Sequence, residues 1–237
     1  PFESPELVHL VEESIAQPLI SAMRAEGILR PCVLYPGCFV SFARDEQAGL
    51  RPSHVRVCEI NIRPGEPEFQ AVVRRVRNLG TLVQAMFTGS LDQVQPEVRE
   101  DQIALCAGLV TGPGGPDGQK GYPWSVTKYE RVELDVPGLT KKNIQLIPSG
   151  MGYSPDRGLF SDGTRVAYLN MNGTVKKGQS RGEVAERLRT RVYNAFDSGR
   201  VRVIPREDEK ENRLDMRRDI GVHYRQADEL WTLAGGR

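Results

Sequence analysis

The sequence is poor in the side chains that usually mark metal binding or nucleophilic catalysis. It has 237 residues but only three histidines and four cysteines, and no two cysteines form a C-x-x-C pair. A structural zinc site needs four such ligands at short spacing, so we expect no metal and no cofactor. The cysteines lie in apolar stretches such as CVLYPGCFV, where a reduced thiol packs as a small hydrophobic side chain.

Long apolar runs are also missing. Nowhere does the chain place about 18 apolar residues in succession, the length that a transmembrane helix requires. The first residues, PFESPELV, lack the basic and apolar regions of a signal peptide. We therefore expect no membrane partner and no secretion by a signal peptide. The expected location is the cytoplasm, or a particle assembled there.

Motifs of hydrolases and phosphate-binding loops are absent as well. The sequence has no G-x-S-x-G. Its glycine-rich run TGPGGPDGQKGYP fails the G-x-x-x-x-G-K-[ST] spacing, because Gln119 precedes Lys120 and Gly121 follows it. These absences favour a protein that is not an enzyme, although carboxylate sites leave little trace in one sequence.

What the chain does have is an uneven distribution of charge. Residues 1–110 contain 10 arginines, no lysine and 14 acidic residues, a net charge of −4. Residues 111–237 contain 22 basic and 17 acidic residues, a net charge of +5. Between them, residues 111–124 are too rich in glycine and proline for a regular element. We expect an acidic half at 1–110, an exposed loop at 111–124 and a basic half at 125–237, with a single domain overall as the alternative.

Hydrophobic periodicity predicts an α+β protein with a mixed, mainly antiparallel sheet and about four helices. An apolar residue every fourth position predicts an amphipathic amino-terminal helix, which Pro18 should kink. Alternating stretches predict strands over residues 28–63, with a bulge near Cys58. Further helices are expected from Pro67, over 96–107 and, with a capping box, over SRGEVAERLRTRVYNAFDSG. VELDVPGLTKKNIQLI resembles the strand–turn–strand of small heat-shock proteins, which implies a hairpin.

One carboxyl-terminal stretch, MRRDIGVHYR, resembles the active-site motif of the HEPN ribonucleases. Its Arg218 and His223 are separated by four residues, and the resemblance implies an RNA-cutting dyad on a helix. The alternation of Ile220, Val222 and Tyr224 with other residues predicts a strand instead. On a strand, Arg218 and His223 would point to opposite faces and could not share a phosphate.

Asp117 is a second weak catalytic candidate. Pro116-Asp117 resembles the start of the PD-(D/E)XK nuclease motif, in which acidic residues hold Mg²⁺. The nearest acid-x-Lys, at residues 208–210, lies about ninety residues further along the chain. A turn at Pro-Asp-Gly is the alternative.

The segment 176–206 is the strongest electrostatic feature, with nine basic and three acidic residues. Such a helix and strand could bind phosphates without reading sequence, or contact a neighbouring subunit. A solvated helix face is the alternative. The candidate contact residues are Lys176, Lys177, Arg181, Arg187, Arg189, Arg191, Arg200 and Arg202.

Charge asymmetry, the loop and the missing catalytic motifs together favour a self-associating structural protein. We expect a viral or phage particle component of the capsid, connector or tail type. In that hypothesis the chain is a homo-oligomer, and residues 176–206 face nucleic acid or the next subunit. The alternatives are a metal-dependent or HEPN-like nuclease and a protein-binding adaptor.

Overall fold

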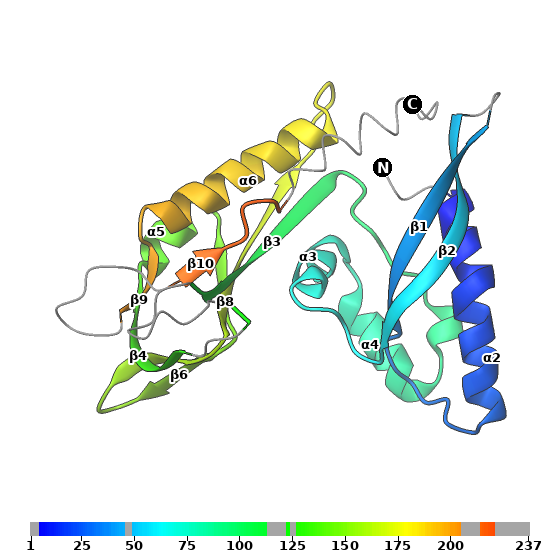
Figure 1. The fold of residues 1–237 in the computed structure, drawn as a ribbon, viewed down its shortest axis with the longest axis horizontal. Coiled ribbons are helices and arrows are strands. Elements are labelled where there is room, and N and C mark those ends of the chain that lie inside the picture. Colours follow the sequence, from blue (N-terminus) through cyan, green and yellow to red (C-terminus); the bar gives the residue numbers. More distant parts are fainter. Residues whose placement is uncertain (1–4, 46–48, 113–121, 124–126, 205–213, 221–237) are drawn as a thin grey trace. The chain divides into compact units, whose positions relative to one another are not determined.

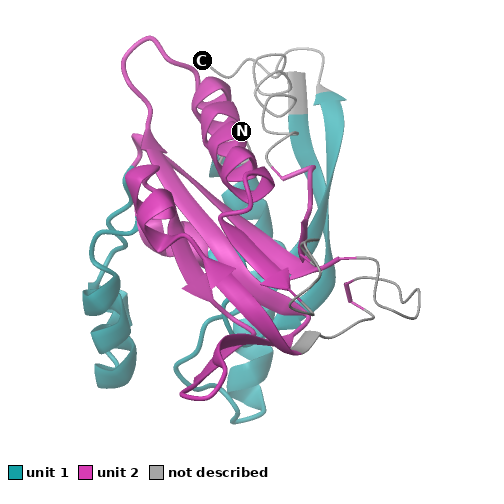
Figure 2. Cartoon of the chain, turned by 90° about the vertical axis from the view of Figure 1, so that its left-hand side faces the viewer, with its two compact units in different colours: residues 1–69, 76–99, 222–237 teal, residues 70–75, 100–221 magenta. Residues whose placement is uncertain are grey.

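A computed structural model of the chain describes residues 5–45, 49–112, 122–123, 127–204 and 214–220. The chain divides into two compact units, which Figure 2 distinguishes by colour. Unit 1 comprises residues 1–69, 76–99 and 222–237, and unit 2 comprises residues 70–75 and 100–221. Among the described residues, no helix has the length and hydropathy needed to cross a membrane.

Unit 1 begins with a nearly continuous helical stretch. It consists of α1 (Pro5–Val11), the π-helical turn η1 (Glu12–Ala16) and α2 (Gln17–Ala25). Pro18 lies in the first turn of α2, where its missing N–H costs little, and the irregular π turn directly precedes it. Gly27 ends the helix in the left-handed conformation, with φ of 68°. The expected amino-terminal helix with an irregularity near Pro18 is confirmed.

A long β-hairpin follows, made of β1 (Tyr35–Asp45) and β2 (Gly49–Asn61). Gly37 pairs with Glu59 and Cys38 pairs with Val57, so Cys58 is an extra residue on β2. The predicted bulge near Cys58 is therefore present. Figure 1 shows α2 running alongside this hairpin.

Two short helices come next, α3 (Glu68–Arg75) and α4 (Leu79–Thr88), followed by the 3₁₀ turn η2 (Leu91–Gln93). The helix expected from Pro67 forms, but it ends at Arg75 because Val76 is extended and bridges to Val98. The Asn78 side chain links the start of α4 to residues 95–97. It donates to the carbonyl of Gln95 and accepts from the amide of Glu97, both at 2.8 Å.

Unit 2 contains two four-stranded sheets, and all described strand pairs are antiparallel. The strand orders are β10-β3-β8-β5 and β6-β7-β4-β9. The first sheet consists of β3 (Gln102–Thr111), β5 (Gln145–Pro148), β8 (Arg165–Thr174) and β10 (Leu214–Met216). The second consists of β4 (Thr127–Leu134), β6 (Met151–Ser154), β7 (Gly158–Gly163) and β9 (Val201–Ile204). The predicted α+β class with a mainly antiparallel sheet is confirmed.

Helix α6 (Arg181–Asp197) lies along β3 and β8 and closes the core of unit 2 (Figure 1). Ser180 and Glu183 form the predicted capping box at its start. Residues 166–171 of β8 are all buried, so both faces of this strand are covered; Asn170 is the polar residue among them. A Cβ on Gly173 would approach the Leu188 and Val184 side chains to 3.1 and 3.2 Å, so glycine allows the close fit of helix and strand.

The helix expected over residues 96–107 is wrong, because β3 begins at Gln102. Strand β3 lies between β8 and β10 and is buried along most of its length. A strand buried on both faces reads as an unbroken apolar run, which periodicity alone does not distinguish from a helix. β3 also belongs to unit 2. The division into an acidic half, a loop at 111–124 and a basic half stays a prediction.

Two further expectations fail at polar turns. The supposed hairpin turn after Asp135 is a short helix, α5 (Val136–Lys141), because the Asp135 carboxylate accepts the Gly138 N–H at 2.8 Å as a helix cap. Strand β10 ends at Met216 and Arg218 lies in a bend, so Arg218 is not on a strand, whereas Val222 and Tyr224 of the expected strand lie outside the described residues.

Candidate functional site

The end of the hairpin gathers polar oxygen atoms on one face. In β2, Glu59 and Asn61 are two residues apart and therefore share a face. Their register partners on β1 are Gly37 and Tyr35, which lie on that same face. Asn61 donates from Nδ2 to Glu59 Oε1 at 3.2 Å. The bond does not use Asn61 Oδ1 or Glu59 Oε2, and both of these oxygen atoms can accept or coordinate elsewhere.

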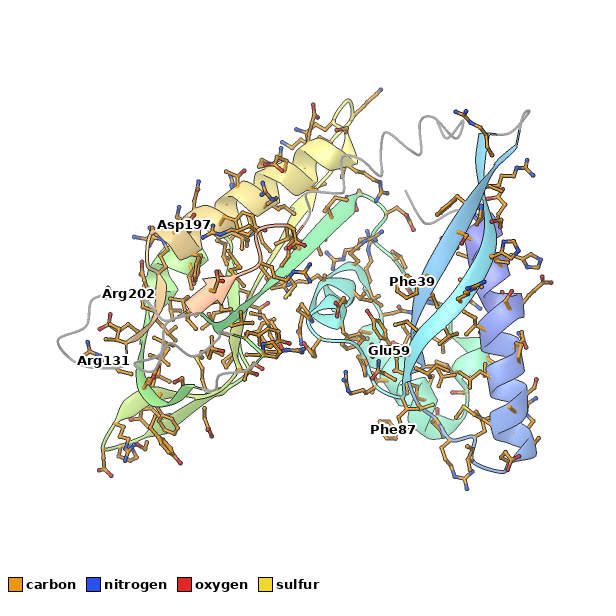
Figure 3. All side chains as sticks on the ribbon, in the orientation of Figure 1. Phe39, Glu59, Phe87, Arg131, Asp197 and Arg202 are labelled. Atoms are coloured by element: carbon orange, nitrogen blue, oxygen red, sulfur yellow. The ribbon has the colours of Figure 1, made fainter. Side chains whose placement is uncertain are left out.

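The bulge at Cys58 is what gives Glu59 this orientation. Without an extra residue, strict alternation would place Glu59 on the same face as Val57. In the structure Val57 pairs with Cys38 and Glu59 with Gly37, so the two side chains point to different faces. Bulges often re-aim a side chain in this way beside functional sites. Figure 3 labels Glu59 on the hairpin.

A glycine fixes the Tyr35 ring against the segment that leads into α3. A Cβ on Gly65 would lie 2.5 Å from carbon atoms of the Tyr35 ring, so only glycine admits this packing. The carbonyl of Gly65 accepts the N–H of Phe69 at 2.9 Å, which ties the same residue to the first turn of α3. The Tyr35 hydroxyl and the start of α3 are thereby brought together.

Glu68, the first residue of α3, acts on the same tyrosine as Glu59 does, because its carboxylate also raises the pKa of Tyr35. Partial burial raises the pKa of Tyr35 above its ordinary value, and the Glu68 and Glu59 carboxylates raise it further. Both carboxylates are therefore close enough to oppose a negative charge on the Tyr35 oxygen. We refer to Tyr35, Glu59, Asn61 and Glu68 as the Tyr35 cluster.

The Tyr35 cluster offers oxygen donors suited to a hard divalent cation. Carboxylate and amide oxygens are the ligands that Mg²⁺ uses, and it is commonly held by one or two carboxylates with phosphate oxygens of a substrate completing its shell. Among the described residues, no group of three or more His, Cys, Asp or Glu side chains forms a protein-only metal cage. A cation bound here would need further ligands in addition to the two carboxylates and the amide of the Tyr35 cluster.

The weak catalytic candidates from the sequence do not meet in the described structure. Asp117 and His223 lie outside the described residues. Arg218 donates to both carboxylate oxygens of Asp197, at 2.7 and 3.1 Å, and this bond lowers the pKa of Asp197. The Arg218 guanidinium also lies 5.4 and 5.6 Å from the ring centres of Tyr193 and Phe196. Arg218 therefore fastens the segment after β10 to α6.

Much of the basic segment is paired within its own unit. Arg200 binds Asp135, and Arg202 binds Glu133. Arg189 binds Glu186 at 3.0 Å and stacks on Tyr193. Arg181 donates to the carbonyl of Glu100 at 2.7 Å.

The exposed members of the basic segment are Lys176, Lys177, Arg187 and Arg191. Contact of this segment with nucleic acid or a neighbouring subunit stays a prediction.

Sequence reasoning passed over the Tyr35 cluster because its members come from three separate elements. The usable signal was local: an acid and an amide at i and i+2, just after a change of phase, at the end of an alternating strand. The sequence alone does not place Tyr35 or Glu68 beside Glu59 and Asn61, because Tyr35 is brought there by strand pairing and Glu68 by the packing of Gly65 on Tyr35.

No family model matches the chain. It is similar, however, to curated proteins of purine biosynthesis. It is 28% identical to the Bifunctional purine biosynthetic protein ADE1 of Schizosaccharomyces pombe over 174 residues, 73% of this chain and 19% of that protein. It is 27% identical to the Bifunctional purine biosynthetic protein ADE5,7 of Saccharomyces cerevisiae over 203 residues, 84% of this chain and 22% of that protein.

A plant protein named for a single activity is also similar. The chain is 26% identical to the chloroplastic Phosphoribosylamine–glycine ligase of Arabidopsis thaliana over 196 residues, 82% of this chain and 32% of that protein. The chain thus spans about a fifth to a third of the length of these relatives.

These similarities overturn the expectation of a structural protein of a viral or phage particle. The relatives are biosynthetic enzymes, and they cover most of the chain. The nuclease alternative likewise finds no support among them. The absence of histidine and cysteine motifs does not exclude catalysis, because carboxylate and amide oxygens need no such motif.

Proposed function

We propose that this chain forms part of an enzyme that ligates glycine to phosphoribosylamine in purine biosynthesis. The observation that carries the proposal is the similarity to three named purine-biosynthetic proteins, which extends over 73 to 84% of the chain. Because the chain spans at most a third of those proteins, it supplies one portion of the catalytic unit rather than the whole.

The chemistry of ligation supports the same assignment. An amine does not displace oxygen from a free carboxylate, so the carboxylate must first be converted into a better electrophile. A phosphoanhydride such as ATP is the class of co-substrate that supplies this activation, and Mg²⁺ bound with its phosphates would neutralise the charge that develops. The Tyr35 cluster presents Glu59 and Asn61 as the oxygen donors for such an ion. Glu68 adds negative charge beside them, and Tyr35 adds a hydroxyl group.

The test is a segment exchange in Saccharomyces cerevisiae. The 203 matched residues of its bifunctional protein are replaced by the corresponding residues of this chain. The exchange protein should support growth without added purine and should turn over phosphoribosylamine only when glycine is present. Glu59→Gln in the exchanged segment should lower that turnover by at least about 100-fold, because it removes a charged ligand of the proposed ion.

Glu12→Gln is the matched control, since it makes the same chemical change at an exposed helix position of unit 1. It should leave turnover within about twofold of the unsubstituted exchange protein. An exchange protein that folds but shows no glycine-dependent turnover would contradict the proposal. Turnover that is indifferent to Glu59→Gln would remove the Tyr35 cluster from it.

A cytoplasmic location belongs with this proposal as a prediction. Location on a particle is not carried forward, because it depended on the structural role that the relatives overturn. Self-association and nucleic-acid contact through residues 176–206 remain predictions of the sequence.

A further inference from the structure

Strand β8 carries two asparagines on the face that is turned away from α6. Asn170 and Asn172 are two residues apart and share a face, whereas Gly173, which lies against α6, is on the other face. Only 1% of the surface of Asn170 is exposed. Burying an amide costs free energy unless the amide is hydrogen-bonded. The partners of these two amides therefore show what this face of the sheet holds.

Those partners belong to α3. Asn170 donates from Nδ2 to the carbonyl of Gln70 at 2.9 Å. Arg74 donates from Nη1 to Asn172 Oδ1 at 3.4 Å and from Nη2 to Gln145 Oε1 on β5. Gln70 and Arg74 are about one helical turn apart. Helix α3 is thus attached to β8 and β5 at two positions.

The two acceptors of Arg74 are themselves held by the sheet. Asn172 donates from Nδ2 to Gln102 Oε1 on β3 at 3.0 Å. Gln145 is in register with Asn170 of β8. Because the strands fix both acceptors, Arg74 meets a prepared pair of amide oxygens, and its planar guanidinium can donate to both at once.

Helix α3 needs this attachment because it is weak by itself. It has eight residues, and among the described residues no side chain caps its start. Isolated helices of this length are marginal in water. Its first two residues belong to unit 1 and its other six to unit 2. The attachment in unit 2 therefore fixes a helix whose first residue, Glu68, belongs to the Tyr35 cluster.

The first turn of α3 is also tied to the Tyr35 ring. The N–H of Phe69 donates to the carbonyl of Gly65 at 2.9 Å. Gly65 lies so close to the Tyr35 ring that a Cβ would be 2.5 Å from its carbon atoms. A displacement of α3 would therefore act on Gly65 and, through Gly65, on the ring.

We propose that Arg74 and Asn170 are positioning residues, which hold α3 on β8 and β5 and thereby keep Glu68 and the Tyr35 ring in place within the Tyr35 cluster. A functional site keeps its geometry when residues outside it fix the elements that carry it. The importance of this attachment for turnover rests on the proposed function, whereas the attachment itself can be measured in the isolated chain.

The first experiment uses Arg74→Met in the isolated chain. Methionine keeps a long side chain and a similar helix propensity but removes the donors. Amide hydrogen exchange of Phe69 should become about tenfold faster, because its bond to Gly65 then opens more often. The NMR signals of the Tyr35 ring should shift. Exchange of the Leu169 amide in β8 should stay within about twofold, which distinguishes lost positioning from a general loss of stability.

Arg77→Met is the matched control, because it makes the same change at an exposed position just after α3. It should leave the exchange of Phe69 and the signals of Tyr35 unchanged. Arg74→Lys retains a donor and should restore part of the protection that Arg74→Met removes. Equal acceleration of Phe69 exchange in Arg74→Met and Arg77→Met would overturn the proposal, because the effect would then not depend on the bonds to β8 and β5.

Asn170→Leu provides a second test without a change of charge. Leucine is similar in size but cannot donate to the carbonyl of Gln70, so Phe69 exchange should again become faster. Asn194→Leu, at an exposed position of α6, is its control and should change nothing. If Asn170→Leu does not fold, the partly buried Arg74 still decides the matter. Unchanged Phe69 exchange in every folded variant of the two residues would overturn the proposal.

The exchange protein in yeast connects this attachment to turnover. Arg74→Met should lower kcat of the glycine-dependent reaction by about tenfold or more, as the loss of a supporting residue around a site commonly does. Arg77→Met should leave it within about twofold. A lower kcat with unchanged Phe69 exchange would contradict the positioning role, and so would faster exchange with unchanged kcat.

The outcomes also separate this inference from the proposed function. Faster Phe69 exchange in Arg74→Met and Asn170→Leu, together with no glycine-dependent turnover in the unsubstituted exchange protein, would keep the attachment of α3 and contradict the function. Turnover that Glu59→Gln abolishes but Arg74→Met does not affect would keep the function and contradict the positioning role.

Discussion

The two units of the chain bury their strands to different extents. In unit 2, β8 is flanked by β3 and β5 and covered by α6, so residues 166–171 are buried. In unit 1, β2 pairs only with β1 among the described residues, and Val57 and Ile60 stay exposed. The strand sequences differ in the same sense, because residues 166–171 of β8 carry no charged side chain whereas β2 contains Arg56 and Glu59.

The buried apolar residues are concentrated in unit 2. Unit 2 contains 25 of the 27 buried apolar residues, so we expect it to dominate the free energy of unfolding. Unit 1 exposes both its apolar surface and the oxygen atoms of the Tyr35 cluster.

The largest expected effect comes from opening the core of unit 2. Leu169→Ala on β8 removes a side chain that is fully buried and should cost about 2–5 kcal/mol of unfolding free energy. Phe87→Ala should cost less than about 0.5 kcal/mol, because its ring faces solvent. Urea unfolding followed by circular dichroism measures both. Similar losses for the two variants would contradict the expected difference between the units, since they would mean that the Phe87 ring is packed in the free chain.

A smaller effect is expected at the start of α6. Ser180→Ala removes the side-chain acceptor for the Glu183 N–H and should cost about 1 kcal/mol. Thr190→Ala, at an exposed position of the same helix, should be neutral or slightly stabilising, because alanine has the higher helix propensity. The measurement is again urea unfolding. Two equal losses would mean that the capping box does not hold the helix in solution.

The elements that could be predicted from the sequence are those specified by local chemistry. Helix α6 has a capping box, a glycine stop and a regular apolar stripe, all within 20 residues. The bulge at Cys58 is visible as a change of phase in VRVCEINIR. In both places neighbouring residues decide the structure, so no information from distant segments is needed.

The rest depended on contacts between distant residues. β3 is a strand because β8 and β10 flank it, although its apolar run fits a helix equally well. The Tyr35 cluster requires the pairing of Tyr35 with Asn61 and the packing of Tyr35 on Gly65. Arg218 was considered as part of a catalytic dyad, yet its partner is Asp197, 21 residues away on α6.

The ion pair of Arg218 and Asp197 gives a smaller, pH-dependent effect. Its hydrogen bond lowers the pKa of Asp197 in the folded chain, so the stabilisation is present above the unfolded value of about 3.9 and is lost as pH falls through the folded pKa. Both side chains are about half exposed, at 53% and 50%, which limits the contribution to about 0.5–1 kcal/mol. Asp197→Asn should therefore destabilise the chain at pH 7.

Asp156→Asn, at an exposed turn of the same unit, is the control and should have no comparable effect. The measurement is urea unfolding between pH 2 and pH 7. The difference between Asp197→Asn and the unsubstituted chain should close at the acidic end. A difference that does not change with pH would show that the hydrogen bond is not formed in the folded state.

The smallest expected effect in free energy concerns unit 1 and bears on function. The pKa of Tyr35 is raised by burial and then by Glu68 and Glu59, so removing either negative charge should lower it toward the ordinary value of about 10. Glu68→Gln should lower the pKa of Tyr35 more than Glu59→Gln does, because the Glu68 carboxylate contributes the larger share. NMR titration of the labelled Tyr35 ring carbon measures each value, with Glu12→Gln as the control.

The same titration in the presence of Mg²⁺ tests whether the Tyr35 cluster of unit 1 binds the cation. A cation held by Glu59 and Asn61 would offset the negative charge that faces Tyr35, so Mg²⁺ should lower the pKa of Tyr35. Glu59→Gln should abolish this response while Glu12→Gln preserves it. If Mg²⁺ changes nothing in the isolated chain but does so in the yeast exchange protein, then the cation needs ligands from both polypeptide portions.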